Sequence, residues 1–173
     1  MSSITSTRDI PVVAIATAIK ARILANVDQF TSSPPVIVEA DDYWNLQATV
    51  SQLTAKLPAC LVHFQEMNGG PRTVAYEQTF QYNIYYFFRI SDTQSTRQAG
   101  SLAAQAIGRI FSSTGVDFDQ FPELDAVLPA GAQLLEVYPS SILPNDSLIA
   151  QNLGWIQVSV VVKIGSVDSS LLH

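Results

Sequence analysis

The sequence has few of the residues from which catalytic and metal sites are most often built. Cys60 is its only cysteine, and His63 and His173 are its only two histidines. A single cysteine excludes an intrachain disulfide and a zinc site made of several thiolates. Cys60 and His63 lie three positions apart on an expected strand, so their side chains point to opposite faces and do not form a catalytic dyad.

Motifs with a known chemical mechanism are also missing. The sequence contains no glycine-rich phosphate loop, no GxSxG and no HExxH. Asp117, Asp119, Glu123 and Asp125 gather in one segment, but their spacing is not that of a calcium-binding EF-hand. A solvated loop accounts for this segment, so we expect no catalytic residue, no metal ligand and no cofactor, and we expect that the protein is not an enzyme.

Charge is scarce as well. Charged residues make up 14% of the chain and hydrophobic residues 47%, with a net charge of -6, whereas a soluble domain usually has about 25% charged residues. This balance is typical of a protein that faces other protein, and it disfavours a basic face for nucleic acid. No apolar run reaches the roughly 20 residues of a membrane helix. We therefore expect no membrane partner.

Helical spacing of apolar residues predicts a helix over residues 10–30, with Lys20 and Arg22 facing outward. A second helix is expected over 41–56 and a third over 94–112, where Gly100 and Gly108 indicate close packing on a sheet. Strands are expected at 36–40, 59–64, about 74–90, 132–139 and 155–164. The segment 116–132 is expected to be irregular, and 140–153 to be a long loop.

This order predicts an α+β fold. We expect a mostly antiparallel sheet of four to five strands with two to three helices packed on one face. Residues 1–173 form one domain in this interpretation, with an insertion at 31–56 and a protruding hairpin loop at 65–78.

Two of the expected strands are apolar on one face and partly apolar on the other. In FQYNIYYFFRI, residues 80–90, the even positions form a continuous apolar face. The odd positions include Tyr85 and Phe87, and the last strand adds Trp155 and Val161 on the same side. The helices are expected to cover the even face, so these four residues are candidates for a subunit interface. On that basis Phe87→Asp or Trp155→Asp is expected to block assembly and leave the monomer folded.

The layout resembles the tail terminator proteins of long-tailed bacteriophages and the related neck and tail-completion proteins. The resemblance rests on an amphipathic first helix, LPACLVHF (57–64), a Gly-Gly loop, TFQYNIYYFFRI (79–90), TRQAGSLAAQAIGRIF (96–111) and LGWIQVSVVVKIG (153–165). The family implies no catalytic residues. It implies a structural virion protein that forms a homo-oligomeric ring, commonly a hexamer, at the head-proximal end of the tail, and that is assembled in the host cytoplasm.

In that role the ring ends the growth of the tail tube, and of a sheath where there is one, and joins the tail to the neck or connector. The loop residues Asn68, Gly69, Gly70 and Arg72 are then candidates for contact with a partner. DNA passes through the lumen without specific binding. The candidates for an acidic lumen are Glu66, Glu77 and the 117–125 loop.

Other accounts remain open from the sequence alone. The chain could be a different neck or tail-completion ring, that is, a head–tail connector. It could instead be a dimeric α+β ligand-binding domain or enzyme, with a pocket on the mixed face beside Gln81, Asn83 and Gln157. Finally, the loops 116–132 or 140–153 could cover Tyr85 and Phe87 within one chain.

Overall fold

The computed structural model describes residues 12–31, 33–40, 52–53, 55–71, 76–89, 94–112, 121–128, 132–145 and 153–166. Its elements follow the order α1 (Val12–Ala25), the 3-10 helix η1 (Val27–Gln29), β1 (Ile37–Ala40), β2 (Ala59–Pro71), β3 (Tyr76–Arg89), α3 (Gln94–Ile110), α4 (Pro122–Asp125), β4 (Ala132–Asn145) and β5 (Leu153–Ser166). The expected strand at 36–40 and the third helix are confirmed within one or two residues.

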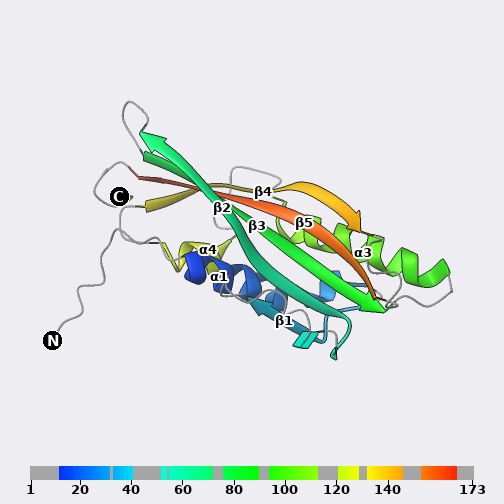
Figure 1. Cartoon of the computed structure of the whole chain (residues 1–173). Helices are drawn as coiled ribbons and strands as arrows, with labels where there is room; N and C mark the ends of the chain where they lie inside the picture. Colours follow the sequence, from blue (N-terminus) through cyan, green and yellow to red (C-terminus); the bar gives the residue numbers. More distant parts are fainter. Residues whose placement is uncertain are drawn as a thin grey trace.

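The strands form one five-stranded sheet in the order β1-β2-β3-β5-β4 (Figure 1). Only β1 pairs in parallel, with β2, and the other three pairings are antiparallel. The predicted α+β class with a mostly antiparallel sheet is therefore confirmed. The arrowhead of β2 and the arrowhead of β3 lie at opposite ends of the long sheet (Figure 1).

β2 is longer than the sequence suggested. The segment 65–78 was expected to be a loop, but β2 continues to Pro71 and β3 begins at Tyr76. Pairing resumes after a bulge between Phe64 and Glu66, so the hairpin extends as a ribbon. The expected loop at 140–153 is likewise wrong at its start, because β4 runs to Asn145. β4 is an edge strand, where a proline such as Pro144 is tolerated.

The first helix is shorter than expected. α1 ends at Ala25, and the chain continues as η1 rather than as α-helix to residue 30. The side-chain amide of Asn26 donates to the Arg22 carbonyl oxygen at 2.9 Å, which satisfies one of the free acceptors at the helix end. In the expected second helix, residues 52–53 are helical, whereas 41–51 and 54 lie outside the described residues.

The main core lies between the helices and one face of the sheet, the helix face. It contains the even positions of β3 and β5, including Tyr82, Ile84, Tyr86 and Val160, all 0% exposed. The two tyrosine hydroxyls are satisfied, because Tyr82 donates to the Val12 carbonyl at 2.9 Å and Tyr86 to a loop carbonyl at 2.7 Å. The expectation that the helices cover the even face is correct.

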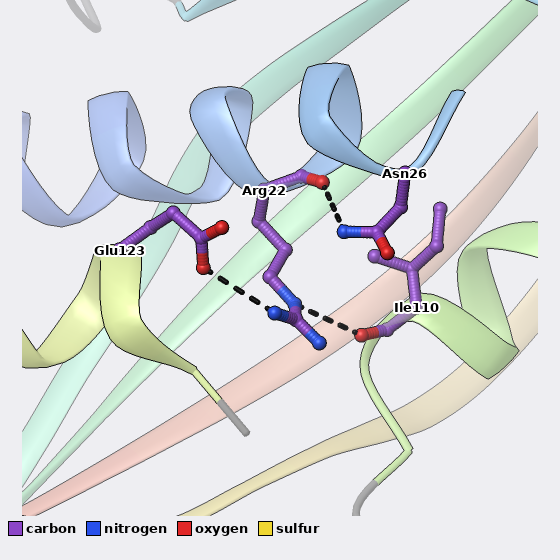
Figure 2. Close-up of polar contacts among 4 residues, drawn as sticks. All are labelled: Arg22, Asn26, Ile110 and Glu123. Carbon is purple, nitrogen blue, oxygen red and sulfur yellow. Dashed lines mark hydrogen bonds and ion pairs between the residues drawn. The ribbon is translucent and has the colours of Figure 1, made fainter. Parts of the chain in front are cut away.

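Arg22 joins three helices and does not face outward as expected (Figure 2). Its guanidinium forms an ion pair with Glu123 at 3.3 Å and donates to the Ile110 carbonyl at 3.3 Å. The guanidinium carbon also lies 4.6 Å from the centre of the Phe121 ring. Lys20 similarly pairs with Glu39 at 3.3 Å. Both cations of α1 are thus used within the chain.

α3 approaches the sheet closely at Gly100. A Cβ atom at this position would lie 2.9 Å from Ile156 Cδ1 and 2.9 Å from the Phe88 ring. A Cβ at Gly108 would meet nothing within 4 Å. The close packing that the glycines indicated therefore applies to the first of them.

Candidate interaction surfaces

The sheet face opposite the helices, the open face, has its own small core at one end. Phe87 is 3% exposed and packs in a cluster with Leu53, Ala59, Leu61 and Leu153. Leu53 comes from the region that was expected to be an insertion. The chain itself therefore buries Phe87, and Phe87→Asp is expected to unfold the monomer, which corrects the sequence-based expectation for that variant. Val161 is also buried, at 6% exposure, so neither residue offers much surface to a partner.

Tyr85 and Trp155 are only partly buried at the margin of this cluster. Their ring centres lie 5.2 Å apart, and the Phe87 ring lies 6.5 Å from the indole. The Trp155 Nε1–H is buried and has no hydrogen-bond acceptor among the described residues. Of the four interface candidates, these two retain an accessible apolar surface.

A hydrogen-bonded polar group lies in the middle of the open face. The Ser159 hydroxyl donates to Asn83 Oδ1 at 2.8 Å, and both side chains are buried, at 2% and 5% exposure. Gln157 donates to the Ser159 hydroxyl at 3.3 Å. Buried polar atoms that are satisfied in this way fix the strand register and need no external ligand.

The outer side of α1 carries an apolar stripe that the sequence analysis did not identify. Val13 is 55% exposed and Leu24 49%, and Thr17 and Ala21 are exposed between them on one line of the helix. The Thr17 hydroxyl donates to the Val13 carbonyl at 2.9 Å, which leaves its methyl group as the outward feature. A helix with apolar residues on every side is usually one that is packed against other protein on every side. The signal was present in the sequence, since few polar residues interrupt 12–25.

The expected partner-contact residues lie at the far end of the β2–β3 hairpin. Asn68 is exposed, and Gly69 and Gly70 belong to β2 and pair with β3. Arg72 lies outside the described residues. This segment projects as an extension of the sheet and not as an irregular loop.

The residues expected to line an acidic lumen do not gather at one place. Glu66 is exposed on β2, and Glu77 is partly buried on β3. Asp125 is exposed in α4, whereas Glu123 in the same helix is paired with Arg22. Residues 117–120 lie outside the described residues.

A hollow of about 380 Å³ opens at the other end of the sheet, beside the last residues of β3. Its lining includes the apolar side chains of Leu57, Pro58, Tyr86 and Phe88, together with two cations, Lys56 and Arg89. Val36, at 69% exposure, lies next to it, because its backbone N–H donates to the Pro58 carbonyl at 2.7 Å. The hollow is at the sheet end and not on the open face, where a ligand pocket was the alternative expectation.

The described residues show little that suggests catalysis. Cys60 is 0% exposed in the helix-face core, and burial raises the pKa of its thiol, so it stays protonated and unreactive. Within the described part of the chain, no three His, Cys, Asp or Glu residues come together to hold a metal ion. Among the described helices, none combines the length and apolar character that crossing a membrane requires.

No family model matches the sequence, and no curated protein matches it. Among solved structures, the chain is similar to one in the virion of a native gene transfer agent particle, with a TM-score of 0.50 and 10% sequence identity. The similarity covers 87% of this chain and 94% of that chain. At this identity it shows a shared fold.

Proposed function

We propose that the chain is a structural virion protein. In this proposal copies of the chain form a ring, commonly a hexamer, at the head-proximal end of a phage tail. The ring ends the growth of the tail tube and joins the tail to the neck. It is built from the chain's apolar surfaces and carries out no reaction.

The observation that supports this proposal most is the extent of the structural similarity. The fold is shared with a virion chain over 87% of this chain and 94% of that one. A match that leaves so little of either chain uncovered means that the similarity extends over the fold and not over one common motif. The name of that particle suggests that assembly into a virion is the role to test first.

The surfaces of the chain fit a role in assembly. The outer side of α1 exposes Val13 and Leu24, and the two cations of this helix, Lys20 and Arg22, pair with glutamates within the chain. A surface of this kind gains free energy when a neighbouring protein removes it from water, at about 25 cal/mol per Å² before the costs of association. Trp155 adds a second apolar site on the open face.

A substitution on the outer side of α1 tests this surface. Leu24→Glu is expected to weaken self-association and leave the fold intact, because the side chain is 49% exposed. Gln98→Glu is a suitable control, since Gln98 is exposed on α3 and the change adds the same charge. Equal assembly of both variants, measured by light scattering, would remove α1 from the interface.

Deletion of the gene tests the proposed role in the virion. Without a terminator, tube growth does not stop at the normal length, so electron micrographs should show tails of abnormal length and few complete particles. Tails of normal length that fail to join heads would instead support the alternative, a neck or connector ring. Normal particles would contradict both roles.

A further inference from the structure

The cations of the described residues differ in whether the chain provides them with a partner. Lys20, Arg22 and Lys163 form ion pairs with glutamates. Lys56 and Arg89 make no ion pair with any residue that the structure describes, and both line the hollow at the end of β3. In a chain with a net charge of -6, two cations that have no ion-pair partner among the described residues and lie beside an apolar hollow indicate a place for an acidic partner.

The opposite half of the sheet carries the complementary charge. Glu66 is exposed there and pairs with Gln81. Glu77 and Glu136 lie within four residues of this pair along the sheet, and Lys163 is the only cation among the described residues of this half. Glu66 pairs in register with Gln81, eight residues before the end of β3 at Arg89. At about 3.4 Å per residue the two ends are roughly 27 Å apart along the strand. One copy therefore cannot bring them together.

We propose that the hollow receives the β2 segment around Glu66 from a second copy of this chain. The contact rests on the proposed ring and specifies how its subunits meet, with the acidic hairpin half of one copy against the basic end of the next. Because the two surfaces are different, each copy uses both of them. Contacts of this heterologous kind produce a closed ring when the rotation between copies closes.

The apolar parts of the two surfaces also match. Met67, next to Glu66, is 49% exposed, although its position in the register places it beside the core residue Phe80. A methionine side chain is flexible and fills irregular apolar spaces well. Adjacent residues of a strand point to opposite faces, so in the proposed contact the inserted strand places Met67 against Leu57 and Phe88 on one side and the Glu66 carboxylate against the cations on the other side.

A charge exchange between two variants tests the contact. One variant carries Lys56→Glu and Arg89→Glu, and the other carries Glu66→Lys. Each alone places like charges in the contact, so we expect a loss of at least tenfold in the self-association constant, measured by light scattering. When the two variants are mixed in equal amounts and alternate in the assembly, every hairpin meets a hollow of the opposite charge. The mixture should therefore recover the wild-type mass. Asp125→Lys on α4, which changes the net charge by the same amount as Glu66→Lys, should assemble normally.

Three results would overturn the proposal. They are normal assembly of both charge-reversed variants, a mixture that does not recover, and a wild-type chain that is monomeric at every concentration. Circular dichroism and thermal unfolding show whether each variant is folded, and the exposed positions predict that they are. A self-association constant that the charge reversals leave unchanged would mean that the contact lies elsewhere, and it would not affect the proposed ring. A deletion strain with normal particles would contradict the ring whatever the charges do.

Discussion

Alanine at Gly100 and at Gly108 is expected to have different effects on stability, although both residues belong to α3. In a helix interior alanine is favoured over glycine by about 1 kcal/mol. At Gly108 nothing lies within 4 Å of the new methyl group, so Gly108→Ala should gain this amount. At Gly100 the methyl group meets Ile156 and Phe88 at 2.9 Å. Overpacking typically costs about 1–3 kcal/mol, which cancels the gain or exceeds it.

Urea and thermal unfolding of the two variants provide the measurement. Gly100→Ala should be less stable than Gly108→Ala by about 1–3 kcal/mol, where 1 kcal/mol corresponds to about 2–4 °C in Tm for a chain of this size. Phe88 lines the hollow and has space to move, which favours the lower part of this range. If both substitutions stabilise the protein equally, α3 does not approach the sheet as closely as described.

Three further results are expected. Arg22→Met and Glu123→Gln should each destabilise the protein, and because their side chains are only 16% and 22% exposed, a double-mutant cycle should give a coupling of about 0.5–1.5 kcal/mol; additive effects would show that the ion pair contributes nothing. Burial raises the pKa of Cys60 above the unfolded value of 9.0, so the free energy of unfolding should fall as the pH rises above 9.0. In pH-dependent urea titrations the free energy of unfolding of Cys60→Ala should fall less steeply than that of the wild type; equal slopes would contradict this. Ser159→Ala removes a donor from buried Asn83 and should cost about 1–3 kcal/mol in the same assay, whereas no loss would mean that water replaces the hydroxyl.

Much of the fold follows from patterns that the sequence displays directly. The alternation in 80–90 predicted β3 and its buried face, because a strand with one side in the core must repeat every two residues. The lengths of β2 and β4 were underestimated, since Gly69, Gly70 and Pro144 usually mark turns. Pairing with β3 keeps Gly69 and Gly70 in β2, and the edge position of β4 tolerates Pro144. Neither the pairing nor the edge position can be predicted from the sequence of one strand alone.

The candidate surfaces were harder to predict for a related reason. Phe87 and Tyr85 share one face of β3, yet Leu53, distant in sequence, helps to bury the first and leaves the second at the margin. The hollow beside Lys56 and Arg89 likewise arises from residues brought together by the fold. The outer stripe of α1 was predictable from its apolar character on every side, provided that Lys20 and Arg22 were known to turn toward Glu39 and Glu123.

The most direct test of the proposed role is to locate the chain in assembled particles. A labelled version of the protein, viewed by electron microscopy in purified virions, should place the label at the junction of head and tail, in several copies around the axis. The same label should appear at one end only of free tails. Label along the tail, on the head shell or absent from the particles would contradict the proposed role.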